Sequence, residues 1–178
     1  MNKDSIHNVR IVDEKVLITP AELKQKLPLP QVLRGQIETH RREISDIIHK
    51  KDKRLLVVVG PCSVHDPLAA LDYGKRLKAL ADELKDELYI VMRVYFEKPR
   101  TTVGWKGLIN DPKIDGSFDV EHGLHIAREL LLELAGLGLP LATEALDPMT
   151  PQYMAVIQRD IAGLKYRGEE TVRLDKSH

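Results

Sequence analysis

The chain has 178 residues, 43% of them hydrophobic, and its 27 acidic residues balance its 27 basic residues. This composition is typical of a globular domain and lacks the basic excess of most nucleic-acid-binding proteins. No apolar run is long enough to cross a bilayer, and residues 1–10 lack the apolar core of a secretory signal. We therefore expect a cytoplasmic protein that binds neither nucleic acid nor a membrane. Its single cysteine, Cys62, agrees with a reducing compartment.

Strand and helix patterns alternate along most of the sequence. Residues before about 30 are polar and are interrupted by Pro20, Pro28 and Pro30, which predicts an extension outside the core. The expected elements are a helix over 31–50, a strand over 55–59, a helix over 67–84, a strand over 89–94, a helix over 120–137, a strand over 141–146 and a helix from 150. The leucines expected to face inward from the second helix are Leu68, Leu71, Leu77, Leu80 and Leu84.

This order of elements predicts parallel strands joined by right-handed crossovers, and hence an α/β sheet or barrel. Such folds place their functional residues at the C-terminal ends of the strands. Cys62, Lys98 and Glu144 lie at or just beyond the ends of three successive strands. They are therefore expected to meet at one edge of the sheet.

The segment 91–112 places cations and hydroxyl groups directly after a buried strand. Arg93 lies within the strand, where a cation needs a counter-charge, and Lys98, Arg100 and Thr101 follow on a loop. Arginine offers a planar fork of donors, lysine a point charge and threonine a hydroxyl donor. Any one of these residues would fit a solvated basic loop. Together they predict a site for a phosphate or a carboxylate.

Two segments, 55–67 and 91–112, closely resemble the short, metal-dependent microbial type of 3-deoxy-D-arabino-heptulosonate 7-phosphate (DAHP) synthase. The resemblance extends through 115–119 and 139–148. It implies the N-terminal part of a (β/α)8 barrel, with three of the eight strands and an N-terminal helical extension. It also implies an enzyme that condenses phosphoenolpyruvate with erythrose 4-phosphate, releasing phosphate and opening the route to chorismate and the aromatic amino acids.

The resemblance assigns catalytic roles to three residues and metal binding to a fourth. Arg93 and Lys98 match residues that hold the phosphate and carboxylate of phosphoenolpyruvate, and Glu144 matches a carboxylate of the same pocket. Cys62 matches a ligand of a divalent metal ion such as manganese or iron. From pattern alone a lone cysteine is more often a small buried hydrophobe, although its thiolate would suit a soft metal ion.

The resemblance also implies contacts with a second substrate and with an inhibitor. Arg100 and Thr101 match residues that contact the phosphate of erythrose 4-phosphate. Asn8, Pro148 and Gln152 match the family's inhibitor pocket, although a loop proline and two exposed amides would be the simpler interpretation. The N-terminal stretch is most similar to the tyrosine-regulated isoenzyme, so tyrosine is the expected inhibitor. The family further implies a homo-oligomer.

After about Ile157 the sequence departs from the family. The expected fourth strand, ending in an arginine and paired threonines, is absent, and 158–178 is a charged run without a period, which we interpret as a shifted reading frame or a junction. The chain is expected to comprise an N-terminal extension and helix over 1–50, a partial barrel over 51–157, and a divergent charged tail over 158–178. We therefore expect a truncated chain that binds metal weakly or not at all and is inactive alone. The alternatives are a non-catalytic half-barrel that binds an anion or a partner subunit, and another sugar-phosphate aldolase.

Overall fold

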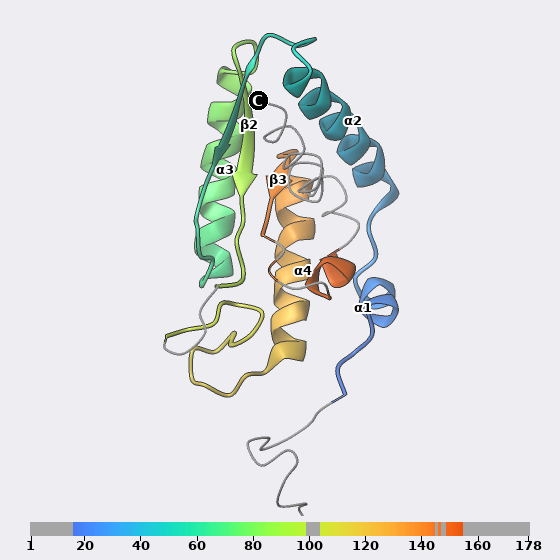
Figure 1. The fold of residues 1–178 in the computed structure, drawn as a ribbon, viewed down its shortest axis with the longest axis vertical. Coiled ribbons are helices and arrows are strands. Elements are labelled where there is room, and N and C mark those ends of the chain that lie inside the picture. The colour runs from blue at the N-terminus through green and yellow to red at the C-terminus, as the bar shows by residue number, and fades with distance from the viewer. Residues whose placement is uncertain (1–15, 99–103, 145, 147–148, 155–178) are drawn as a thin grey trace, which may run out of the picture.

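The structure is a computed structural model that describes residues 16–98, 104–144, 146 and 149–154. Its centre is a three-stranded sheet in the order β1-β2-β3 (Figure 1). The elements, in chain order, are α1 (Pro20–Lys26), α2 (Gln31–Ile48), β1 (Leu55–Val59), α3 (Pro67–Glu83), β2 (Leu88–Arg93), α4 (Val120–Gly136) and β3 (Leu141–Ala142). Residues 150–154 are also helical. None of the helices in these described ranges is long and apolar enough to span a membrane.

The strands are parallel, as the sequence predicted. Leu55 of β1 lies opposite Leu88 of β2, and the pairing continues to the end of β1. β3 is shorter than the predicted 141–146, because its partner β2 ends at Arg93, whose register partner is Ala142. The C-terminal ends of all three strands therefore lie at one edge of the sheet.

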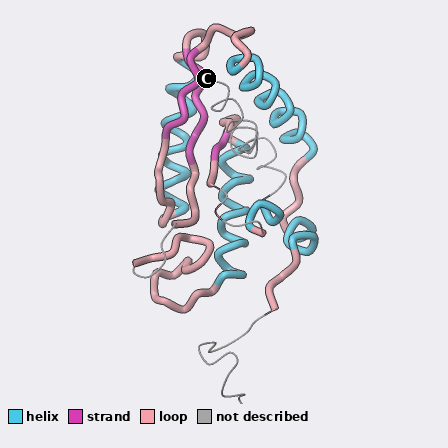
Figure 2. The backbone as a smooth tube through the Cα atoms, viewed as in Figure 1, coloured by secondary structure: helices cyan, strands magenta, loops and turns pink. Residues whose placement is uncertain are grey.

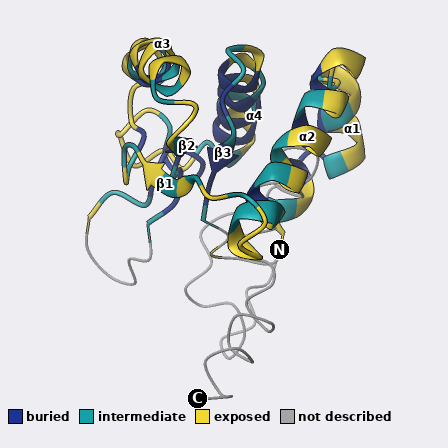
Figure 3. Cartoon of the chain, turned by 90° about the horizontal axis from the view of Figure 1, so that it is seen from above, coloured by how far each residue is buried: buried dark blue, intermediate teal, exposed yellow. Residues whose placement is uncertain are grey.

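Helices α3 and α4 lie side by side on one face of the sheet, with α1 and α2 beyond α4 (Figure 3). A Cβ atom at Gly74 of α3 would lie 2.6 Å from Cδ2 of Leu134 in α4, so glycine allows the two helices to approach closely. This approach corrects the expected face of α3 in part. Leu77 is buried and Leu71 packs against the core as expected, but Leu68 and Leu80 are exposed, and Ala70 and Gly74 are buried as well.

The N-terminal segment from Ile18 onward belongs to the core, contrary to the expected extension. Helix α1 begins with a capping box: Thr19 Oγ1 accepts a hydrogen bond from the Glu22 N–H at 3.2 Å, and the Glu22 carboxylate accepts one from the Thr19 N–H at 2.8 Å. Such a box satisfies main-chain donors that the first turn would otherwise leave without partners. The helix buries Leu23 completely.

Two side chains join this N-terminal segment to the segment that follows β3. The buried Arg128 of α4 donates hydrogen bonds to the main-chain oxygens of Leu27, at 2.8 Å, and Tyr153, at 3.0 Å. The Tyr153 hydroxyl donates to the oxygen of Ile18 at 2.8 Å. Burial lowers the pKa of Arg128, because removing a cation from water disfavours its charged form. The segment around α1 is thus fixed to the body of the molecule.

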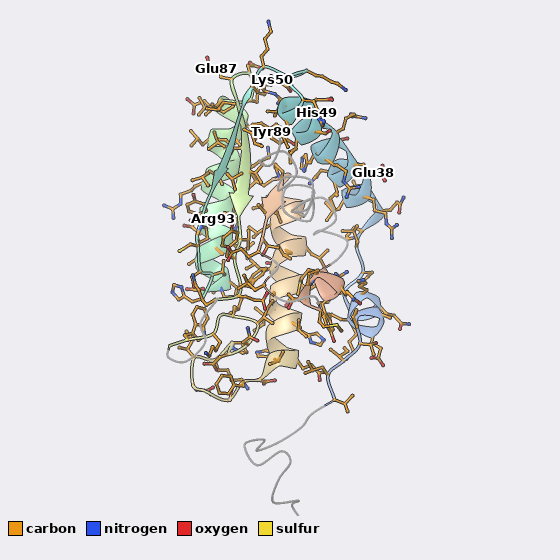
Figure 4. The ribbon with its side chains drawn as sticks, in the orientation of Figure 1. Glu38, His49, Lys50, Glu87, Tyr89 and Arg93 are labelled. Atoms are coloured by element: carbon orange, nitrogen blue, oxygen red, sulfur yellow. The ribbon has the colours of Figure 1, made fainter. Side chains whose placement is uncertain are left out.

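A second polar cluster fixes α2 against the N-terminal ends of the strands. Arg54 donates to Asp52 at 2.6 Å and to Glu43 at 3.2 Å, and its guanidinium carbon lies 4.9 Å from the ring centre of Tyr89. The Tyr89 hydroxyl donates to Glu43 at 3.1 Å, and the ring of His40 meets Tyr89 edge-on. Burial raises the pKa of Tyr89 and lowers that of His40. Tyr89 and Arg93 lie at opposite ends of β2 (Figure 4).

Candidate functional site

The candidate site lies at the C-terminal edge of the sheet. Beyond β2 the chain continues through Val94 and Phe96, both buried, to Lys98. The loop over 104–119 then returns to the start of α4 at the same end of the molecule (Figure 2). Residues that follow β1, β2 and β3 can therefore meet here, as expected for parallel strands.

Arg93 is held against the end of β1. Its Nε and Nη2 atoms donate hydrogen bonds to the Gly60 oxygen at 3.0 Å and 2.7 Å. Its guanidinium carbon also lies 5.3 Å from the ring centre of Tyr95, a cation–π distance. Gly60 has a φ of +145°, and a Cβ atom there would lie 2.5 Å from the Arg93 oxygen. Only glycine allows the backbone after β1 to come this close to Arg93.

Lys98 reaches toward the same segment. Its Nζ atom donates a hydrogen bond to the Cys62 oxygen at 2.6 Å. Arg93 and Lys98 therefore converge on main-chain oxygens two residues apart, Gly60 and Cys62. In the part of the chain that the structure describes, the hydrogen bonds of both cations go to neutral carbonyl oxygens and not to a carboxylate. No carboxylate among the described residues competes for these hydrogen bonds, so an anion placed near both cations would be attracted by both.

Close pairing between residues 96–98 and residues 106–107 fixes the position of Lys98. The Lys98 N–H donates to the Lys106 oxygen at 3.1 Å, and Glu97 pairs with Gly107 in an isolated antiparallel bridge. Gly107 has a φ of +104°, and a Cβ atom there would lie 2.1 Å from the Phe96 oxygen. The backbone at residue 107 can approach the backbone of residues 96–97 this closely only because residue 107 is glycine.

The structure places Glu144 at the same edge. It lies two residues beyond Ala142, which pairs with Arg93, and its side chain is half-buried. Its backbone therefore lies at the edge where the other two strands end. The role of its carboxylate in the site stays a prediction.

The described residues do not form a metal centre by themselves. The Cys62 side chain is exposed, and within the described ranges no group of three or more His, Cys, Asp or Glu side chains is placed to hold an ion. A catalytic metal ion normally needs about three protein ligands. Cys62 could supply one of these ligands.

The remaining predicted site residues are placed only in part. Arg100, Thr101, Asn8 and Pro148 lie outside the described residues. Gln152 is exposed, and its N–H donates to the Met149 oxygen at 2.9 Å within the helical segment 150–154. The roles of all five in substrate or inhibitor binding stay predictions.

Sequence reasoning did not identify two residues that shape the site, Gly60 and Tyr95. A signal for each was present. Gly60 ends an apolar strand and precedes Pro61, a pattern that indicates a close backbone approach. Tyr95 follows Arg93 by two residues, and side chains at this spacing lie on the same face of an extended chain.

Comparison with known proteins identifies the family. Residues 19–161 match the model of the DAHP synthetase I family. The chain belongs to this family. It is 66% identical over 154 residues to the phospho-2-dehydro-3-deoxyheptonate aldolase, Tyr-sensitive, of Escherichia coli K12, covering 86% of this chain and 43% of the relative. It is 56% identical over 148 residues to the Phe-sensitive protein of the same organism, covering 83% and 42%.

A solved structure agrees with the family assignment. The phospho-2-dehydro-3-deoxyheptonate aldolase of Francisella tularensis SCHU S4 matches with a TM-score of 0.80 at 51% identity, over 83% of this chain and 43% of that protein. The chain thus spans less than half the length of these relatives. The three parallel strands and their helices confirm the expected fold class, a part of a (β/α)8 barrel.

Proposed function

We propose that this chain carries the phosphoenolpyruvate-binding edge of a DAHP synthase, which joins phosphoenolpyruvate to erythrose 4-phosphate and releases phosphate. The observation that carries the proposal is the convergence of Arg93 and Lys98 on the Gly60 and Cys62 oxygens. Phosphoenolpyruvate carries two anionic groups, a phosphate and a carboxylate, and two adjacent cations that keep their charge suit such a ligand. Family membership and the identity with the aldolases support the choice of substrate.

The two cations would divide the binding between them. Arg93 uses Nε and Nη2 to contact Gly60, so Nη1 remains to donate to an anionic oxygen. Lys98 is a compact charge that can move from the Cys62 oxygen to the ligand. Glu144, at the end of the third strand, would orient Lys98 or position a water molecule. Arg100 and Thr101 would contact the phosphate of erythrose 4-phosphate.

A metal ion and an effector belong to the same proposal. Cys62 would supply one thiolate ligand to a divalent metal ion such as manganese or iron, of which iron suits a soft sulfur ligand better. Tyrosine is the proposed inhibitor, because the relative that is 66% identical is named Tyr-sensitive. Asn8, Pro148 and Gln152 would contribute to its pocket. The cytoplasmic location and the homo-oligomeric state stay predictions.

One observation favours a second candidate, a non-catalytic half-barrel that binds a partner subunit. Leu55 and Val58 of β1 are 64% and 44% exposed, although apolar strands in parallel sheets are normally covered on both faces. A partner chain could cover these side chains. The two candidates differ in whether DAHP forms.

The test joins residues 1–157 to the part of the E. coli Tyr-sensitive relative that this chain does not cover, and measures DAHP formation from both substrates with manganese. We expect product, and we expect Lys98→Ala to lower the rate by roughly 10²- to 10³-fold, because one preorganised charge is lost. The matched control, Lys85→Ala, removes an exposed lysine near the other end of the sheet and leaves the rate unchanged. An active fusion protein that tolerates Lys98→Ala, or an inactive one, would contradict the proposed function.

The chain without the fusion partner is the second arm of this assay, and we expect it to form no product. Formation of DAHP by this chain, abolished by Cys62→Ala, would show that the expectation of inactivity is wrong.

A further inference from the structure

We propose that Tyr95 is a positioning residue that holds the Arg93 guanidinium in the orientation that binds the anion. This inference rests on the proposed function, since it concerns how the same site binds phosphoenolpyruvate. It adds a residue whose ring acts through Arg93 and need not touch the substrate.

The guanidinium of Arg93 is restrained from two directions. The Gly60 oxygen accepts from Nε and Nη2 and so fixes one edge of the guanidinium group. The Tyr95 ring, 5.3 Å from the guanidinium carbon, restrains it from a second side. With these two contacts in place, the edge that carries Nη1 has a defined direction. Binding an anion at that edge then requires less ordering of a long, flexible side chain.

An aromatic ring can restrain a cation without neutralising it. A carboxylate in the same place would form an ion pair with Arg93 and would compete with an incoming anion. The face of a tyrosine ring carries only the partial negative charge of its quadrupole. The guanidinium therefore stays in place and keeps its full positive charge for the substrate.

Tyr95 is itself well fixed. Its two neighbours in sequence, Val94 and Phe96, are 0% and 3% exposed and anchor the backbone on either side. Its main-chain oxygen accepts a hydrogen bond from the Val64 N–H at 2.9 Å. This bond ties Tyr95 to the segment that presents the Cys62 oxygen to Lys98. The ring is therefore placed by the same backbone contacts that bring the two cations together.

The experiment uses the whole 178-residue chain labelled with nitrogen-15 and titrated with phosphoenolpyruvate. Two quantities are measured by NMR: the dissociation constant, and the ring-current shift of the Arg93 Nε–H signal. Tyr95→Leu and Tyr95→Met remove the ring, and Tyr95→Phe keeps it. We expect the two aliphatic variants to weaken binding roughly 3- to 30-fold, the range of a cation–π contact, and to lose the ring-current shift. Tyr95→Phe should keep the shift and bind within about twofold of the unaltered chain.

A double-mutant cycle separates positioning of Arg93 from a general structural role. In an Arg93→Gln background, Tyr95→Leu should change the dissociation constant by less than about twofold, because the group it positions is gone.

Three results would overturn the inference. Binding by the leucine and methionine variants that equals the unaltered chain would show that the ring does not position Arg93. If Tyr95→Phe weakened phosphoenolpyruvate binding as much as Tyr95→Leu does, the effect would belong to the hydroxyl group. If Tyr95→Leu weakened binding by the same factor with Arg93 and with Arg93→Gln, the role of Tyr95 would be structural. Failure of the unaltered chain to bind phosphoenolpyruvate would instead contradict the proposed function, and the inference would fall with it.

Discussion

Gly60 determines how closely the end of β1 approaches Arg93. Replacement by alanine would place a Cβ atom 2.5 Å from the Arg93 oxygen at a φ of +145°, so the backbone must move. We expect Gly60→Ala to lower the free energy of unfolding by about 1–3 kcal/mol, the usual cost of a strained backbone position, and to weaken phosphoenolpyruvate binding. Urea denaturation and ligand titration measure the two effects.

The chain offers a matched control for this change. Gly35 is exposed in α2, and a Cβ atom there would meet nothing within 4 Å. Gly35→Ala should therefore stabilise the protein by up to about 1 kcal/mol, because alanine favours the helix. If Gly60→Ala were as stable as Gly35→Ala, the close approach described here would be wrong.

His40 should make stability depend on pH. Burial lowers its pKa below the ordinary value of 6.5, against an opposing effect of Glu43, and Lys78 lowers it further. The unfolded chain therefore takes up a proton at a higher pH than the folded chain does. The neutral His40 side chain therefore contributes to the free energy of unfolding above pH 6.5, and this contribution is lost as the pH falls through its lowered pKa.

The measurement is the free energy of unfolding between pH 8 and pH 5 for the unaltered chain and for His40→Gln. The variant should lose less stability over this range, because glutamine does not titrate. His122→Gln, at an exposed position of α4, is the control and should keep the original slope. Identical slopes for the unaltered chain and His40→Gln would contradict the burial of His40.

At this scale the sequence predicted that Arg93 and Lys98 would lie near each other, and the structure brings both to main-chain oxygens of one short segment. Their binding of an anion stays a prediction, because either residue alone would also fit a solvated basic loop. The contact of Arg93 with Tyr95 depends on two side-chain orientations, which the sequence pattern does not encode. The position of Gly60 at the end of an apolar strand indicated a close backbone approach, but only the folded chain shows that Arg93 is the residue approached.

At the scale of elements, α4 is the helix that joins the segment 18–27 to the helical segment 150–154. Arg128→Met should leave the buried Tyr153 oxygen and the partly buried Leu27 oxygen without their donor. We expect a loss of about 2–4 kcal/mol in the free energy of unfolding, because each buried group without a partner costs about 1–3 kcal/mol. We also expect faster proteolysis near α1, which depends on these contacts.

The control is Arg76→Met on α3, where the arginine is exposed and paired with Asp72. An exposed ion pair contributes about 0–1 kcal/mol, so this change should have little effect. Equal stability of the two variants would show that Arg128 does not hold the segments 18–27 and 150–154 in place.

The elements were predictable wherever one local signal dominated. The apolar runs of β1 and β2 gave the ends of these strands to within about one residue. Helix α3 begins as expected at Pro67, directly after Asp66, whose side chain accepts hydrogen bonds from the Leu68 and Ala69 N–H groups. The capping box at Thr19 was also readable, but the nearby prolines favoured an extension. The buried face of α3 was predicted only in part: Leu77 is buried and Leu71 packs against the core, but Leu68 and Leu80 are exposed, and Gly74 forms the close contact with α4.

At the scale of the whole molecule, the sheet separates two polar clusters with different roles. At the N-terminal ends of the strands, Arg54 is neutralised by Asp52 and Glu43 and supports α2. At the C-terminal ends, Arg93 and Lys98 contact neutral oxygens and keep their charge. The first arrangement joins α2 to the strands, and the second suits an anionic ligand. This difference is the physical basis for proposing a substrate site at the C-terminal edge.

Mapping where phosphoenolpyruvate binds tests this claim most directly. The chain labelled with nitrogen-15 is titrated with the ligand, and the changes in the main-chain amide signals are assigned along the sequence. We predict saturable changes that are largest at Gly60, Cys62 and Arg93 and that become weaker in Lys98→Gln. The absence of saturable changes, or changes that are largest around Arg54 and Tyr89 at the opposite end of the sheet, would contradict the account.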